Sequence, residues 1–190
     1  MQLSTEELVD ITADAATLFL GMIAEDAGVA EPGGLEGVVA TIPFGDPTVG
    51  ALTVACPPEL GELLAATVLE VPEPSADDVA DAVGELANVI AGGVAGMLGR
   101  SVLSLPTVTT GYGLATRVPG AETVRQRLLL VDEHPLVVAL HETPAGVAVD
   151  DAAAAAAQAA QAVTSANGAP TAGPADAHAA PAPSDGDPGR

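Results

Sequence analysis

Apolar and polar residues follow two different periods along most of the chain. Apolar residues recur every three to four positions in three segments, which predicts helices at residues 4–24, 57–69 and 75–98. Segments rich in Val, Leu, Ile or Thr predict strands at residues 36–44, 49–56, 102–105, 108–112, 123–131 and 136–141. This order of elements predicts an α+β fold, with helices packed on one face of a mostly antiparallel sheet.

Two of the predicted helices carry start signals. Ser4 with Glu7, and Ser75 with Asp78, have the three-residue spacing of a capping box. The inward stripe expected for the first helix consists of Leu8, Ile11, Ala15, Leu18 and Met22.

The long third helix has two contrasting faces on a helical wheel of about 100° per residue. Its apolar stripe consists of Val79, Val83, Leu86, Ile90, Val94 and Met97. Four residues fall within about 60° of one another on the opposite side, namely Asp81, Glu85, Asn88 and Gly92. We therefore expect the carboxylates and the amide to point away from the core.

This outward face has two interpretations. A solvated helix face is the simpler one. However, no basic residue on the face offers an ordinary ion pair, and four glycines weaken the helix by about 1 kcal/mol each relative to alanine. Small residues allow close approach of a neighbouring backbone. The second interpretation is therefore a surface on which another protein docks.

The charge of the chain limits its partners. Five basic residues, all Arg, stand against 26 acids, giving a formal net charge of −21. Such a chain repels phosphate backbones and anionic lipids, so we expect neither nucleic acid nor membrane as a partner. The N-terminal segment lacks the basic region of a signal peptide, and acids interrupt its apolar residues. These features predict a cytoplasmic protein.

Composition changes near Asp150. Residues 1–148 are predicted to form one domain, and residues 149–190 form a tail rich in Ala, Pro and Gly. The tail has too few large apolar residues to offset the entropy of ordering it, so we expect it to be disordered.

Other reactive residues give little support for chemistry elsewhere. Cys56 is the only cysteine and ends an apolar run, which favours a buried structural thiol. His134 and His141 are seven positions apart on one strand and should face opposite sides, so no metal site is predicted. Arg125 and Arg127 share a strand face, where an exposed structural role or an interface is expected.

A family resemblance changes the meaning of the outward face. The segment DAVGELAN, residues 81–88, followed by VIAGGVAGML, resembles the helix motif of the CheC/CheX/FliY chemotaxis phosphatases. LSLPTVTTG, residues 103–111, resembles the proline-containing strand that follows this helix in the family. The motif occurs once, which favours the CheX-like branch.

The resemblance implies a substrate and a division of roles. The substrate would be the phosphorylated aspartate of a CheY-type response regulator, which brings its own Mg²⁺, and the chain itself would need no cofactor. Asn88 would orient the attacking water, and Glu85 would contact the lysine at the regulator's phosphorylation site. Asp81 would make a peripheral contact, and Gly92 would allow close approach.

The resemblance also implies a homodimer formed through the sheet, for which the strand at residues 123–131 is an expected edge. Two rival functions remain. One is a non-catalytic adaptor of the same fold that binds response regulators. The other is an assembly protein that uses a sheet edge.

Overall fold

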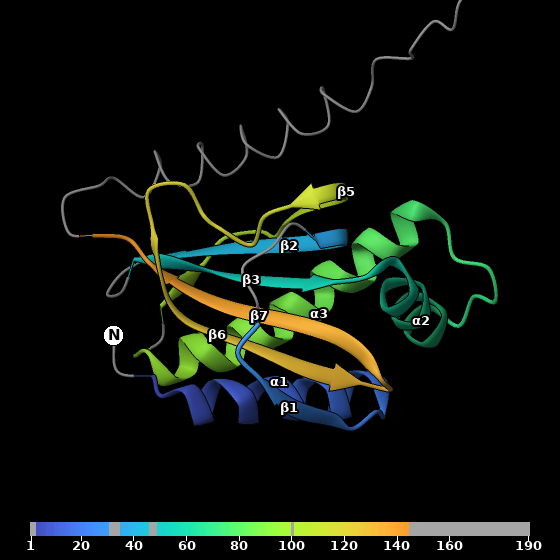
Figure 1. Cartoon of the computed structure of the whole chain (residues 1–190), viewed down its shortest axis with the longest axis horizontal. Helices are drawn as coiled ribbons and strands as arrows, with labels where there is room; N and C mark the ends of the chain where they lie inside the picture. Colours follow the sequence, from blue (N-terminus) through green and yellow to red (C-terminus); the bar gives the residue numbers. More distant parts are fainter. Residues whose placement is uncertain (1–2, 31–34, 46–48, 100, 145–190) are drawn as a thin grey trace, which may run out of the picture.

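A computed structural model describes residues 3–30, 35–45, 49–99 and 101–144. Within these residues the chain forms three helices and a seven-stranded sheet (Figure 1). The helices are α1 Thr5–Leu20, α2 Pro58–Leu69 and α3 Ala76–Met97. The tail predicted from residue 149 onward lies outside the described residues.

Every strand pairing in the sheet is antiparallel. The strands are β1 Ala24–Gly28, β2 Leu35–Gly45, β3 Gly50–Cys56, β4 Val102–Leu103, β5 Thr107–Leu114, β6 Glu122–Val131 and β7 His134–Glu142. Their order is β1-β6-β7-β3-β2-β4, and β5 also pairs with β2. Both β4 and β5 therefore lie along the same side of β2, one after the other.

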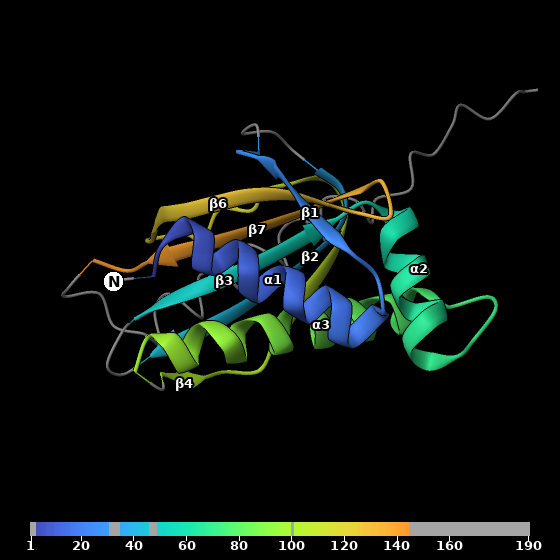
Figure 2. The same ribbon diagram turned by 90° about the horizontal axis from the view of Figure 1, so that it is seen from below.

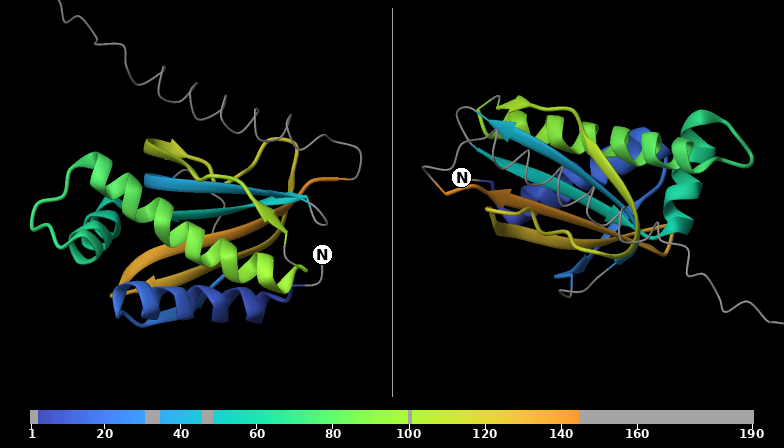
Figure 3. Two further views of the ribbon diagram at one scale, coloured as in Figure 1. Left: turned by 180° about the vertical axis from the view of Figure 1, so that it is seen from behind. Right: turned by 90° about the horizontal axis from the view of Figure 1, so that it is seen from above.

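The helices cover one face of this sheet, as predicted. Figure 2 and the left panel of Figure 3 show α1 and α3 lying across the strands, with α2 at one end of the layer. Alternate residues of β7, such as Leu136 and Leu140, belong to the same buried cluster as Leu86 and Ile90 of α3. The α+β prediction is confirmed.

The predicted capping boxes are both present. Ser4 N donates to Glu7 Oε2 at 2.7 Å, and Glu7 N donates to Ser4 Oγ at 3.1 Å. Ser75 and Asp78 make the equivalent pair at 2.8 Å and 3.2 Å. These caps satisfy backbone N–H groups that the first helical turn leaves without partners.

The first helix is shorter than expected. It ends at Leu20, because Gly21 adopts a left-handed conformation with φ of 65° and closes the helix. The chain then forms β1, a strand that the sequence pattern did not predict. Its five residues, AEDAG, are exposed or half-buried and show no apolar alternation.

The presence of β1 corrects the prediction that residues 123–131 form a sheet edge. β6 lies between β7 and β1, and β1 pairs with it from Leu128 to Val131. β1 is short and leaves the first half of β6 unpaired on that side among the described residues.

Two residues of the predicted inward stripes are exposed. Leu18 is 84% exposed, because α1 packs through the neighbouring stripe of Leu8, Thr12, Ala15, Ala16 and Leu20. Thr12 can be buried there because its hydroxyl donates to the Leu8 carbonyl at 2.7 Å. Met97 is 56% exposed, because α3 ends at this residue and no further turn covers it.

The opposite face of the sheet is crossed by the connection between β5 and β6. Leu114, at the end of β5, packs against Val39, Ala55 and Val137 from three other strands. Thr53 Oγ1 donates to the Thr116 carbonyl at 3.3 Å and fixes the crossing segment to β3. This face is therefore partly covered without a helix.

Helix α3 is long and apolar enough to span a membrane by length and composition. In this fold, 56% of its most apolar window is buried against the sheet and the other helices. Its apolar character therefore has an explanation in the core.

Candidate functional site

The polar face of α3 points away from the core, as predicted. Asp81, Glu85 and Gly92 are exposed and Asn88 is half-buried, whereas Leu86 and Ile90 are fully buried on the other side. The helix therefore presents two carboxylates and one amide on one accessible face.

Asn88 and Glu85 are joined by a hydrogen bond. Asn88 Nδ2 donates to Glu85 Oε2 at 3.3 Å, across one turn of the helix. Since the amide nitrogen is engaged, the carbonyl oxygen of the same group, Oδ1, points away from Glu85 and remains an acceptor. Glu85 keeps further lone pairs for a cationic partner.

An open depression of about 440 Å³ borders these side chains. Asp81, Glu85 and Asn88 of α3 line one part of it. Leu69 at the end of α2 and Leu105 between β4 and β5 also line it. The three predicted polar residues are therefore brought together beside one hollow. The two leucines carry no site signal in the sequence, because Leu105 stands alone in a connection and Leu69 is the last residue of the amphipathic helix α2.

The glycines of α3 serve two different purposes. A Cβ atom on Gly84 would lie 3.3 Å from Val108 Cγ2, and one on Gly93 would lie 2.6 Å from Ile11 Cγ2. At Gly93 a Cβ would force Ile11 or the helix to shift, whereas at Gly84 it would require Val108 to move by only a few tenths of an ångström, so glycine permits close packing most clearly at Gly93. A Cβ on Gly92 or Gly96 would meet no atom within 4 Å. The described structure gives no packing reason for these two.

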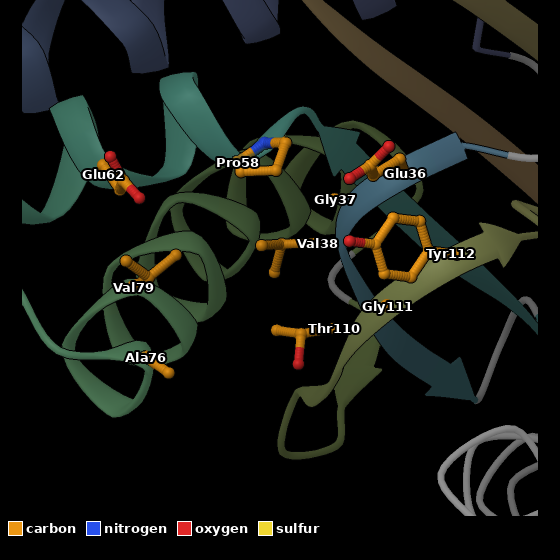
Figure 4. A pocket seen from close by; sticks show the side chains of 10 residues that line it. All are labelled: Glu36, Gly37, Val38, Pro58, Glu62, Ala76, Val79, Thr110, Gly111 and Tyr112. Carbon is orange, nitrogen blue, oxygen red and sulfur yellow. The ribbon is translucent and has the colours of Figure 1, made fainter. Parts of the chain in front are cut away.

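A second hollow of about 240 Å³ lies near the first turn of α3 (Figure 4). Glu36, Glu62 and Tyr112 surround an apolar part formed by residues such as Val38 and Val79. It contains none of the predicted site residues. The depression beside Asn88 is therefore the one that the predicted polar residues line.

Cys56 is buried, as expected for a structural thiol. Burial raises the pKa of Cys56 to about 12, so the thiol stays protonated and unreactive at neutral pH.

His141 is buried between strands and is not part of the α3 face. Its Nε2 lies 2.9 Å from Thr53 Oγ1, and its Nδ1 lies 3.1 Å from Thr123 Oγ1. Burial lowers the pKa of His141 to about 4, which keeps the ring neutral. In the part of the chain that the structure describes, no group of three or more His, Cys, Asp or Glu residues is arranged to hold a metal ion.

The two neighbouring arginines of β6 are half-buried and not exposed as expected. Arg125 Nη1 donates to the Val124 carbonyl on the same strand. Arg127 Nε is buried and has no hydrogen-bond partner among the described residues. Neither side chain lies in the depression beside Asn88.

Comparisons with known proteins agree with this fold. Residues 38–128 match the family model described as "Chemotaxis phosphatase CheX". No curated protein matches this chain.

Solved structures with the same fold are distant in sequence. CheX from Vibrio vulnificus is 15% identical, with a TM-score of 0.61 over 72% of this chain and 93% of that one. CheX from Desulfovibrio desulfuricans is 16% identical, with a TM-score of 0.60 over 73% and 98%. The complex of CheX, CheY, BeF₃ and Mg²⁺ from Borrelia burgdorferi is 16% identical, with a TM-score of 0.56 over 73% and 96%. The match of residues 38–128 to this family model, together with the shared fold, supports the description of this chain as CheX-like.

Proposed function

We propose that this chain hydrolyses the phospho-aspartate of a CheY-type response regulator in chemotaxis or another two-component pathway. The observation that carries the proposal is the pair Glu85 and Asn88, hydrogen-bonded at 3.3 Å on the exposed face of a core helix. The family description names a chemotaxis phosphatase, and a relative of the same fold forms a complex with CheY. In that complex, BeF₃ stands in for the phosphoryl group.

Asn88 is assigned the role of positioning the attacking water. An acyl phosphate is already activated, so its hydrolysis mainly requires positioning and stabilisation of charge. The free Oδ1 of Asn88 can accept a hydrogen bond from a water molecule. This hydrogen bond would orient the water so that a lone pair of the water oxygen points toward phosphorus. The water oxygen bonds to phosphorus as the bond to the aspartate oxygen breaks. The electron pair of that bond stays on the aspartate carboxylate, and the two protons of the water leave with the inorganic phosphate.

Glu85 is assigned to docking. Its exposed carboxylate can make a charge-assisted hydrogen bond with the lysine at the regulator's phosphorylation site. A carboxylate is poorly suited to hold the water, because it would repel the phosphoryl oxygens. Asp81 supports this contact from one turn earlier, and Gly92 keeps the following turn bare so that the regulator approaches closely.

The metal ion in this mechanism belongs to the regulator. Mg²⁺ bound beside the phospho-aspartate would neutralise the charge that develops on the phosphoryl oxygens, and this chain would need no cofactor of its own. With a cytoplasmic signalling protein as substrate, we place this chain in the cytoplasm as well.

We also propose a homodimer formed through the sheet. Among the described residues, β1 pairs only with Leu128–Val131 of β6. The first half of β6 therefore has backbone N–H and C=O groups on that side with which a strand of a second copy could pair. A sizing measurement by light scattering at several concentrations tests this. A monomer at all concentrations would overturn it.

A phosphate-release assay tests the proposed activity. The CheY-type receivers of the source organism are phosphorylated with a small-molecule phosphodonor and Mg²⁺, freed of the donor, and mixed with the full chain. We expect faster release of inorganic phosphate from at least one receiver than from that receiver alone.

The assay also separates the enzyme from the adaptor. Binding of a receiver without faster phosphate release would support the non-catalytic adaptor and reject hydrolysis. If no receiver binds, the assembly role at a sheet edge becomes the better explanation.

A further inference from the structure

Leu105 is the most exposed large apolar residue beside the candidate site. It is 87% exposed, in the short connection that joins β4 to β5. Single exposed leucines are ordinary on protein surfaces. Leu105 differs because it lines the same depression as Glu85 and Asn88.

The backbone on both sides of Leu105 is fixed. Ser104 N donates to the Pro43 carbonyl of β2 at 2.9 Å. On the other side, Pro106 has a restricted backbone and lies against α3, with its Cγ 3.7 Å from the position of a Cβ on Gly84. Leu105 is therefore held out into solvent between two anchored residues, so binding would have to order its side chain but little of its backbone.

A second apolar side chain faces the same depression from another element. Leu69, the last residue of α2, is 41% exposed and lines the hollow together with Leu105. The depression therefore has an apolar part next to its polar part. Removing exposed apolar side chains from water is the dominant favourable contribution to most protein–protein association.

We infer that Leu105, together with Leu69, forms an apolar contact that binds the response regulator beside the polar contact made by Glu85. This inference rests on the proposed function, and it adds the kind of surface that the regulator presents. That surface would carry an exposed apolar side chain next to the cationic group of its phosphorylation site.

The charge of this surface favours a regulator over two other candidate partners, namely a second copy of the chain and the chain's own segment after residue 148. The face carries Asp81 and Glu85, and α3 contains no Lys or Arg. A second copy that met this face with its own α3 face would bring the carboxylates of Asp81 and Glu85 against their counterparts, which would repel one another. The segment after residue 148 is also acidic and contains only small side chains apart from two Val, two Gln, one His and one Arg. A partner with a cation beside an apolar residue complements both parts of the depression.

The experiment compares Leu105→Ala with Leu18→Ala in the full chain. Leu18 is a matched control because it is 84% exposed and lies on α1, away from the depression. Binding to each receiver activated with beryllofluoride and Mg²⁺ is measured by titration, and phosphate release is measured over a range of receiver concentrations. We expect Leu105→Ala to weaken binding and raise KM about tenfold, with kcat unchanged. Leu18→Ala should match the wild type, and Leu105→Met should restore most of the binding.

Three results would overturn the inference. They are wild-type affinity in Leu105→Ala, an equal loss of affinity in Leu18→Ala, and a fall in kcat with unchanged affinity. The binding measurement stands apart from catalysis. If the wild type binds a receiver without hydrolysing its phospho-aspartate, the proposed activity fails, and loss of binding in Leu105→Ala still supports the contact. If no receiver binds the wild type, both proposals are rejected.

Discussion

Asn88 donates its amide hydrogen to Glu85, so the two residues of the candidate site are oriented by one another before any partner binds. The helix repeat places them one turn apart, and the hydrogen bond selects one orientation of the amide. Its carbonyl oxygen is then directed away from the carboxylate. This relationship gives the two side chains separate roles that substitutions can distinguish.

Replacing Asn88 by Ala should remove hydrolysis and leave binding nearly intact. The substitution deletes the group that orients the water, and Ala has a higher helix propensity than Asn, so the fold should persist. We expect the accelerated phosphate release at saturating receiver to fall by about 100-fold, the typical effect of losing one preorganised polar group.

Asp81→Ala is the matched control for this prediction. It removes another polar side chain from the same exposed face. Since Asp81 is assigned only to docking, we expect phosphate release at saturating receiver to stay close to that of the wild type. Full activity in Asn88→Ala, or an equal loss in both variants, would reject the role of Asn88.

Replacing Glu85 by Gln should act mainly on binding. Gln keeps the length of the side chain and an oxygen that accepts from Asn88, and it loses the negative charge. Loss of a hydrogen bond between charged groups typically costs about 1.5–3 kcal/mol, so binding should weaken at least tenfold. Titrations at several salt concentrations should also show a weaker salt dependence than for the wild type. An unchanged affinity and salt dependence would argue against a lysine contact.

Alanine substitutions at neighbouring glycines should change stability in opposite directions. Gly92→Ala places its Cβ in open space and should stabilise α3 by up to about 1 kcal/mol. Gly93→Ala would place its Cβ 2.6 Å from Ile11 Cγ2, so α1 or α3 must shift, at a net cost of about 1 kcal/mol or more. Thermal or urea unfolding measures both effects.

The Gly92→Ala variant also tests whether the helical turn at Gly92 takes part in docking. If a regulator approaches the helix at Gly92, the stabilised Gly92→Ala variant should bind it more weakly than the wild type. A variant that is both more stable and equally tight in binding would show that this turn is not part of the interface.

Stability should fall at mildly acidic pH because of His141. Burial holds the pKa of the folded state at about 4, below the usual 6.5 of the unfolded chain. The unfolded state therefore binds more protons in this window. The contribution to stability is complete above pH 6.5 and is lost as pH falls toward 4. Between pH 7 and 5 the free energy of unfolding should decrease by about 2 kcal/mol from this residue alone. Urea unfolding at several pH values measures this change.

His141→Gln provides the comparison for the pH effect. It removes the titrating group and keeps hydrogen-bonding atoms for Thr53 and Thr123, so stability should vary much less between pH 7 and 5. A wild-type dependence in His141→Gln would mean that another group is responsible.

Much of the fold was predictable because its signals are local. The capping boxes at Ser4 and Ser75, and the 3.6-residue period of α3, depend on residues only a few positions apart. The outward direction of Asp81, Glu85 and Asn88 followed from the same period. The predicted burial of Leu18 was wrong. The buried face of α1 includes the two small residues Ala15 and Ala16, and hydrophobicity alone does not reveal that this face packs in the core.

The features that could not be predicted depend on distant parts of the chain. β1 is recognisable as a strand only through its pairing with β6, about a hundred residues later. His141 is buried because its partners, Thr53 and Thr123, come from two neighbouring strands. The depression beside Asn88 forms where three elements meet, so its leucines carry no site signal in the sequence.

The capped start and buried underside of α3 have a consequence for the rate of complex formation. Glu85 and Asn88 lie in the middle of a helix that is buried along one side from Val79 to Val94, so their backbone opens only when much of the core opens. Amide hydrogen exchange there should be among the slowest in the chain. The association rate constant should accordingly be limited by diffusion and orientation, since no rearrangement of α3 is needed to form the site. Any slow step on binding would then belong to the regulator.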